Sequence, residues 1–333
     1  MMGVGVYLVI HDNLSPGIMI AGTILLGRAM APVESLIGNW NGLVAARSAY
    51  ARLANLFPAI FDQTERQPPP PPQGRIQVER AFLAGTDKDH PILRQVDFDL
   101  PAGRSLAILG PSGSGKSSLA KLVVGVWSPT AGHVRIDGAE IDHWDPKQLG
   151  PCLGYLPQDV ELFPGSIAEN IGRFDTSNRE AIIQAAQAAH AYELILRLPE
   201  GFDTKLGEGG IQLSAGQAQR IGLARALYRQ PRIVVLDEPN ANLDAEGEQA
   251  LLQALNELKT QGSTIILVTH KPSLVSNMDY LLVMREGRVE LLGPRDEVLA
   301  RLNGSKAQPN PDTSASSHAG MPGMAVIRTG SRT

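Results

Sequence analysis

A glycine-rich segment, residues 110–117, constrains the fold of this 333-residue chain more than any other part of its sequence. It has the pattern Gly-x-x-x-x-Gly-Lys-Ser, follows a short apolar strand predicted over 105–109, and precedes a helix predicted over 118–124. Glycines let the backbone curl so that several N–H groups point at one phosphate, and the helix dipole favours the same anion. The sequence therefore predicts an α/β fold with a site for a nucleoside triphosphate.

Individual positions of this loop have predicted contacts. Lys116 can reach the β- and γ-phosphates, and the Ser117 hydroxyl can ligate Mg²⁺, so a nucleoside triphosphate and Mg²⁺ are the expected ligands of this loop. The candidate nucleotide-binding residues of the segment are Gly110, Pro111, Ser112, Gly113, Ser114, Gly115, Lys116, Ser117 and Ser118.

A second apolar strand, beginning near residue 232, ends in the carboxylates Asp237 and Glu238. An uninterrupted apolar run is typical of a parallel strand buried on both faces, and ligands bind at the carboxyl ends of such strands. We expect Asp237 to hold Mg²⁺, directly or through water. We expect Glu238 to polarise the attacking water as a general base; the alternative is a supporting role beside the site.

Composition divides the chain into four parts. Residues 1–60 are hydrophobic and poor in charge, and 61–74 form a linker whose five consecutive prolines favour extended polyproline II, with a ligand for a partner as the alternative. Residues 75–302 have the pattern of an α/β domain, and 303–333 are predicted to be disordered. The net charge of −4 gives no electrostatic reason to expect a nucleic-acid partner, and a single cysteine excludes an internal disulfide.

Two apolar runs near the N-terminus leave the character of that part open on hydropathy alone. Residues 1–10 and 15–27 are each shorter than the roughly 18 uncharged residues of a transmembrane helix. One interpretation is a membrane hairpin whose second helix spans about 16–37, with Arg28 and Glu34 facing protein or water. The other is a soluble pair of hydrophobic helices packed on the α/β domain.

Residues 213–217, Leu-Ser-Ala-Gly-Gln, resemble the Leu-Ser-Gly-Gly-Gln signature of the ABC ATPase family, with Ala215 in place of a glycine. Ser214, Gly216 and Gln217 match, and in the family this element contacts the γ-phosphate held by the opposite subunit. Ser214 is also a plausible N-cap for the helix that follows. The resemblance covers roughly residues 75–300 and implies a P-loop NTPase fold with a helical signature subdomain.

Three further segments follow the family's order. Gln158 resembles the Q-loop glutamine, which touches Mg²⁺ and the attacking water, and residues 242–244 resemble the D-loop, which communicates across the dimer. His270 resembles the H-loop histidine, which hydrogen-bonds the γ-phosphate. The resemblance therefore implies that Glu238, His270 and Gln158 are catalytic and that Ser117, Gln158 and Asp237 hold Mg²⁺.

One element of the family pattern is displaced. The family usually stacks adenine on an aromatic side chain about 25 residues before the loop, and Gly85 stands near that place here. Phe82 is the nearest aromatic, and aliphatic contacts with the base are the alternative.

Other segments resemble exporters. Residues 207–210 resemble the exporter X-loop, and 162–171 resemble the exporter version of the segment after the Q-loop. Residues 237–244 and 14–34 resemble permease/ATPases of bacterial type I secretion systems that export proteases and lipases. This finer resemblance favours the membrane interpretation: one or two partial transmembrane helices, with most of the transmembrane domain missing.

The resemblance implies an ATP-hydrolysing exporter subunit that dimerises through its nucleotide-binding domains in the bacterial inner membrane, with the ATPase domain in the cytoplasm. Its implied substrate is a polypeptide with a C-terminal signal. Its implied partners are a periplasmic membrane-fusion adaptor and an outer-membrane channel. The alternatives are an exporter of lipid, peptide or drug, a soluble ABC ATPase, and an inactive transporter remnant.

Overall fold

The computed structural model describes residues 7, 16–61, 72–85, 91–207 and 210–305. The chain divides into two compact units, residues 1–67 and 68–333, and the division falls inside the segment predicted as a linker. Most of that segment, the predicted tail beyond 305 and the first apolar run apart from Tyr7 lie outside the described residues.

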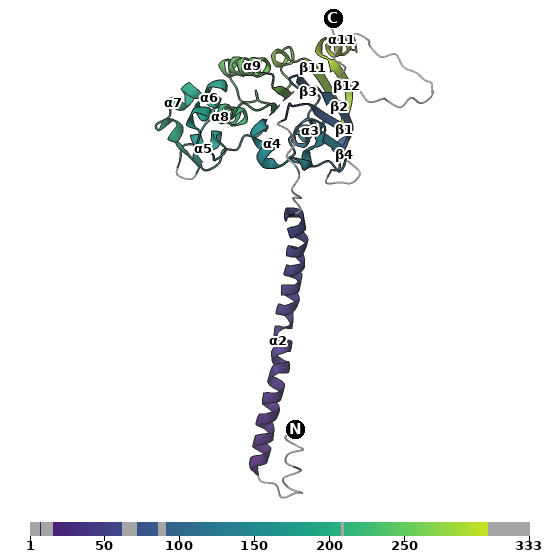
Figure 1. The fold of residues 1–333 in the computed structure, drawn as a ribbon, viewed down its shortest axis with the longest axis vertical. Helices are drawn as coiled ribbons and strands as arrows, with labels where there is room; N and C mark the ends of the chain where they lie inside the picture. Colours follow the sequence, from purple (N-terminus) through teal and green to yellow (C-terminus); the bar gives the residue numbers. More distant parts are fainter. Residues whose placement is uncertain (1–6, 8–15, 62–71, 86–90, 208–209, 306–333) are drawn as a thin grey trace, which may run out of the picture. The chain divides into compact units, whose positions relative to one another are not determined.

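The N-terminal unit contains one long helix, α2 (Pro16–Phe61), of 46 residues (Figure 1). Its stretch Ile20–Ala54 is long and apolar enough to cross a membrane by length and composition. The prediction that the second helix spans to about residue 37 is too short, because alanines, leucines and arginines beyond that point continue the helix to Phe61.

The second unit is built on a six-stranded sheet with the order β12-β11-β3-β10-β9-β6. Its central strands are parallel, and β12 pairs antiparallel with β11. The strands are β3 (Ser105–Leu109), β6 (Leu153–Leu156), β9 (Ile233–Asp237), β10 (Thr264–Val268), β11 (Tyr280–Arg285) and β12 (Arg288–Pro294). The two strands predicted from apolar runs are β3 and β9.

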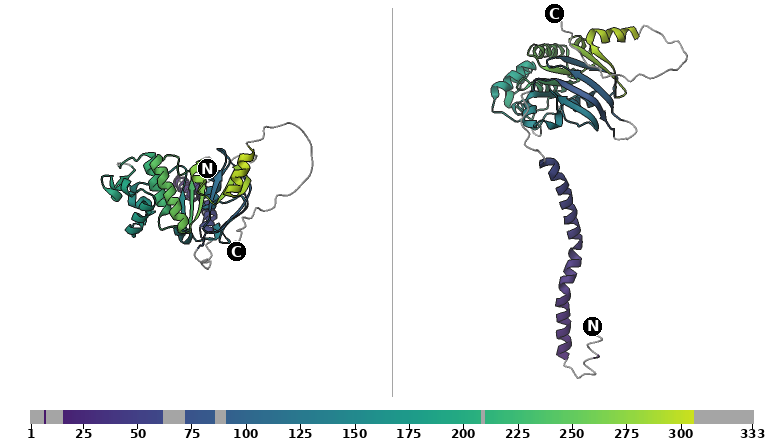
Figure 2. Two further views of the ribbon diagram at one scale, coloured as in Figure 1. Left: turned by 90° about the horizontal axis from the view of Figure 1, so that it is seen from above. Right: turned by 45° about the vertical axis from the view of Figure 1, so that its right-hand side comes forward.

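An antiparallel sheet with the order β2-β1-β4-β5 forms a second layer. It consists of β1 (Ile76–Leu83), β2 (Leu93–Leu100), β4 (Ala131–Ile136) and β5 (Ala139–Glu140). Helices α5 to α8 gather on the side of the unit away from β1, β2 and β4 (Figures 1 and 2).

The helices of this unit are α3 (Lys116–Val123), α4 (Pro146–Cys152), α5 (Ile167–Ile171), α6 (Arg179–Ala188), α7 (Tyr192–Leu196), α8 (Ala215–Leu227), α9 (Ala245–Thr260), α10 (Pro272–Val275) and α11 (Arg295–Ser305). Short pieces complete it: η1 (Ile141–His143), η2 (Gly201–Asp203), and the strand pair β7 (Gly165–Ser166) and β8 (Lys205–Leu206).

Both faces of the large sheet are buried. Leu106 and Ile108 of β3 point into a core shared with α3 and the antiparallel sheet, whereas Ala107 points into the core shared with α5–α9. Successive residues of β9 and β10 alternate between the two cores in the same way. Burial on both faces explains why these strands are continuous apolar runs, and it makes the sheet a rigid platform for the loops at its edge.

Candidate functional site

Four predicted motifs lie at one edge of the large sheet, because four adjacent parallel strands end there. The glycine-rich loop follows β3, and Glu238 follows β9 directly. One residue separates His270 from the end of β10, and one residue separates Gln158 from the end of β6. Near these ends, Ile108 of β3 is paired with Val268 of β10, so the two strands end side by side. The carboxyl edge of a parallel sheet is where ligands bind in such folds.

The glycine-rich loop is open to a ligand on one side. Pro111, Ser112 and Gly113 are exposed, and helix α3 begins at Lys116 without a side chain that caps its first N–H groups. Uncapped N–H groups at a helix start are donors for an anion. The loop and helix therefore fit the phosphates of a nucleotide.

Lys116 is held over the loop. Its Nζ donates to the carbonyl oxygens of Gly110, at 3.0 Å, and Pro111, at 2.8 Å. Burial lowers the pKa of Lys116, and the nearby carboxylates Glu238 and Asp237 partly oppose that shift. The ammonium group is thus placed beside the loop before any phosphate arrives.

Asp237 has the character of a cation ligand. Asp237 is 1% exposed, and its Oδ1 has no hydrogen-bond partner among the described residues. Burial raises the pKa of this carboxyl, a hydrogen bond with the Ser117 side chain lowers it, and the charge of Glu238 raises it again. A buried carboxylate oxygen without a partner, next to a serine hydroxyl, fits Mg²⁺, which prefers oxygen ligands.

The three residues predicted to be catalytic lie together. Gln158 Nε2 donates to Glu238 Oε2 at 3.1 Å, and His270 Nε2 lies 3.3 Å from Glu238 Oε1. Glu238 has a left-handed backbone with φ of 48°, and its N–H donates to the carbonyl of Val268 at 2.9 Å. This turn aims the carboxylate away from the strand, with its side chain 26% exposed and accessible to water. Gln158, also predicted as a metal ligand, bonds to Glu238 in this arrangement.

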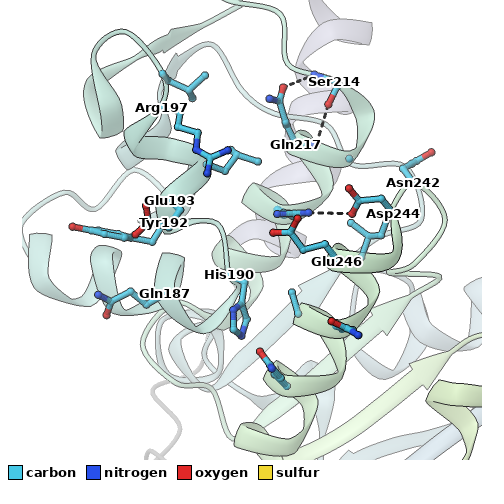
Figure 3. Close-up of a pocket in the computed structure, with 18 residues that line it drawn as sticks. Gln187, His190, Tyr192, Glu193, Arg197, Ser214, Gln217, Asn242, Asp244 and Glu246 are labelled. Atoms are coloured by element: carbon cyan, nitrogen blue, oxygen red, sulfur yellow. Dashed lines mark hydrogen bonds and ion pairs between the residues drawn. The ribbon is translucent and has the colours of Figure 1, made fainter.

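The signature segment opens helix α8. Ser214 is the N-cap, as the sequence predicts, and forms a capping box: its Oγ accepts from the Gln217 N–H at 3.3 Å, and its own N–H donates to Gln217 Oε1 at 2.9 Å (Figure 3). A Cβ on Gly216 would lie 2.7 Å from the carbonyl oxygen of Asn242. The signature and residues 242–244 therefore form one packed unit.

Sequence reasoning missed an ion pair that joins these two segments. Arg220 of α8 lies 3.2 Å from Asp244, which is also the N-cap of α9 (Figure 3). The pattern of residues 213–217 predicts a helix after Ser214 but does not say which residue pairs with Arg220. The ion pair is revealed only by the fold. Both segments line an open cavity of about 1150 Å³ whose lining includes no residue of the glycine-rich loop.

Phe82, the aromatic residue nearest the family's adenine-stacking position, faces away from the core. Phe82 is partly buried on β1, between Ala81 and Leu83, whose side chains point into the core, so its own side chain points to the other face of the sheet. Residues 86–90 and Glu208 of the predicted X-loop lie outside the described residues.

Comparison with known proteins agrees with this geometry. Residues 93–241 match the ABC transporter family. The type I secretion system ATP-binding protein PrsD of Rhizobium meliloti is 49% identical over 302 residues, which are 90% of this chain and 52% of that protein. An ATP-dependent lipid A-core flippase of Haemophilus influenzae is 36% identical over 308 residues, which are 90% of this chain and 51% of that protein.

Among solved structures, a bacterial Atm1-family ABC exporter with ATP bound is similar with a TM-score of 0.65 and 30% identity, over 93% of this chain and 56% of that one. The chain thus spans about half the length of these two relatives, PrsD and the flippase. The matched region contains the glycine-rich loop, the signature and the carboxylate strand in one P-loop fold. The chain therefore carries the nucleotide-binding ATPase domain of the ABC transporter family.

Proposed function

We propose that this chain is the ATP-hydrolysing subunit of an ABC exporter that moves polypeptides with a C-terminal signal. The observation that carries the choice of substrate is the difference in identity: 49% to a type I secretion protein against 36% to a lipid flippase over similar lengths. We also propose the division into a membrane part (1–60), a linker (61–74), the ATPase domain (75–302) and a tail (303–333).

The proposed chemistry follows from the side chains at the sheet edge. The glycine-rich loop and Lys116 bind the phosphates, and Ser117, Asp237 and Gln158 would hold Mg²⁺, which supplies positive charge beside the phosphate oxygens. Glu238 accepts a proton from the attacking water. His270 and Gln158 flank the Glu238 carboxylate and fix its direction.

The proposed active form is a homodimer. The signature and the glycine-rich loop line different parts of the surface, and the cavity at the signature contains no residue of the loop. A head-to-tail pair would bring Ser214, Gly216 and Gln217 of one copy to the nucleotide held by Lys116 of the other. ATP then favours the closed pair because it has contacts with both copies only in that state.

The proposed location is the bacterial inner membrane, with the ATPase domain in the cytoplasm. Helix α2 is about 69 Å long at 1.5 Å per residue, more than twice the roughly 30 Å of a bilayer core. Only part of it would lie in lipid, which leaves a helical extension at the membrane surface. A periplasmic membrane-fusion adaptor and an outer-membrane channel are the proposed partners.

The test is an exchange of Glu238→Gln at the native locus of the source bacterium. We expect one or more polypeptides to disappear from the culture medium while envelope lipids are unchanged, as measured by mass spectrometry of both fractions. Altered lipid distribution with an unchanged secreted fraction would instead favour the lipid exporter. If neither the secreted polypeptides nor the envelope lipids change, the inactive remnant would be favoured.

A further inference from the structure

The turn between β11 and β12 touches the glycine-rich loop from behind. The N–H of Gly287 donates to the carbonyl oxygen of Ser114 at 3.2 Å. The carbonyl oxygen of Gly287 accepts from the N–H of Arg94, in β2, at 2.7 Å. One residue thus ties the phosphate loop to a neighbouring strand, although it lies 173 positions after Ser114 (287 − 114).

The contact leaves no room for a side chain. Gly287 has φ of +77°, and a Cβ placed on it would lie 2.5 Å from the carbonyl oxygen of Ile92. The same carbonyl oxygen would lie 3.0 Å from a Cβ on Gly115, the residue that caps α3. The turn, the start of β2 and the loop therefore meet at one point with backbone against backbone.

A second contact comes from the same hairpin. A Cβ on Gly110, the first glycine of the loop, would lie 2.3 Å from the carbonyl oxygen of Met284 in β11. Gly110, at the start of the loop, thus lies against the hairpin itself. Gly115, near its end, lies against the Ile92 carbonyl, which the hairpin also contacts. A loop whose N–H groups must converge on a phosphate needs a fixed backbone. The hairpin packs against the side of the loop opposite the phosphates and restricts its movement.

We propose that Gly287 is a positioning residue for nucleotide binding: it clamps the loop in the conformation that receives the phosphates. The inference rests on nucleotide binding by this domain. A Cβ at position 287 would displace the turn or Ile92 by about 1 Å, which is enough to misalign the loop through Ser114 and Gly115.

Gly287→Ala is the test, and Gly262→Ala is its matched control. Gly262 has nearly the same backbone, with φ of +76°, but among the described residues nothing lies within 4 Å of a Cβ there. Both variants carry the backbone strain of alanine in the left-handed region, so they differ only in the close approach. ATP affinity of the full chain is measured by titration calorimetry in EDTA, and thermal midpoints are measured alongside.

We expect Gly287→Ala to weaken ATP binding at least about tenfold, measured well below its thermal midpoint, which the close approach should lower, and Gly262→Ala to leave ATP binding nearly unchanged. Hydrogen exchange should also rise at the amides of Ser114 and Gly115 in Gly287→Ala alone. Equal ATP affinities in the two variants would overturn the proposal. If wild-type protein did not bind ATP, the nucleotide site itself would be wrong, which is a distinct outcome.

A second variant covers the case in which Gly287→Ala does not fold. Insertion of one glycine between Glu286 and Gly287 lengthens the turn without adding a side chain and displaces the donor to Ser114. Weaker ATP binding in the folded insertion variant would support the clamp. Wild-type affinity, or loss of folding in both variants, would make Gly287 a residue of the fold alone and would overturn the proposal.

Discussion

At Asp237 the fold buries a carboxylate whose Oδ1 has no partner among the described residues. Burial raises the pKa of this group, so the folded state binds its proton more tightly than the unfolded state does. At a pH below the ordinary pKa both states are protonated and there is no penalty. As the pH rises from the ordinary pKa to the raised pKa, the folded state loses stability relative to the unfolded state, and the loss is complete above the raised pKa.

Asp237→Asn should therefore stabilise the protein in metal-free, nucleotide-free buffer. We expect its thermal midpoint to rise by a few degrees near about pH 7 and the gain to disappear near about pH 3, because the neutral amide has no charge to desolvate. The same variant should lose the Mg²⁺ dependence of ATP binding. A midpoint below that of the wild type at neutral pH would contradict this account of Asp237.

Glu238→Gln should lower ATP hydrolysis at least about a hundredfold and leave ATP affinity within about twofold of wild type, because an amide cannot accept the proton of water. Steady-state turnover and titration calorimetry measure the two quantities. Glu290→Gln, at an exposed position of β12, is the control that should keep both. Turnover within about threefold of the wild type would remove Glu238 from the role of base.

At the scale of elements, helix α8 depends on its cap. Ser214→Ala removes one half of the capping box and should cost about 1 kcal/mol of folding stability. Asn178→Ala is a matched control, because Asn178 caps α6 by accepting from the Ala181 N–H at 2.9 Å. Denaturant unfolding should show similar losses for both, whereas ATP hydrolysis should fall only in Ser214→Ala. Equal hydrolysis in both would limit Ser214 to capping.

The strands that carry the site were predictable, but their neighbours were not. The apolar run before Asp237 predicts a buried parallel strand because both of its faces are covered. The hydrogen bond between Gln158 and Glu238 joins residues 80 positions apart, and it needs β6 beside β9, which no local pattern states. The predicted end of α2 near residue 37 was wrong because the helix-forming residues beyond it continue the helix to Phe61, past the length that a membrane span requires.

The contact of Gly287 with the glycine-rich loop had no signal in the sequence. A glycine after a glutamate between two apolar runs indicates a hairpin turn, but nothing in that pattern says what the turn touches. Its contact with Ile92 and Ser114 is a product of tertiary structure. The P-loop, the carboxylates and the signature were found because each has a local context of strand, loop and helix that its chemistry requires.

At the scale of the whole molecule, the separation of loop and signature predicts that ATP controls assembly. Glu238→Gln, which retains ATP, should double in mass when ATP and Mg²⁺ are added, as measured by light scattering in detergent. Ser214→Arg in that background should keep it monomeric, whereas Asn178→Arg should not. A mass that does not respond to ATP in the Glu238→Gln protein would contradict the shared site.

The position of β3 between β10 and β11 also affects how the protein is made. Both neighbours lie far along the chain: the N–H of Ser105, which starts β3, bonds to Asp279, 174 positions later. A ribosome therefore releases the strand that carries the phosphate loop long before either of its edges can pair. Until β10 and β11 emerge, this apolar strand has two open edges, which makes it a binding site for a chaperone during synthesis.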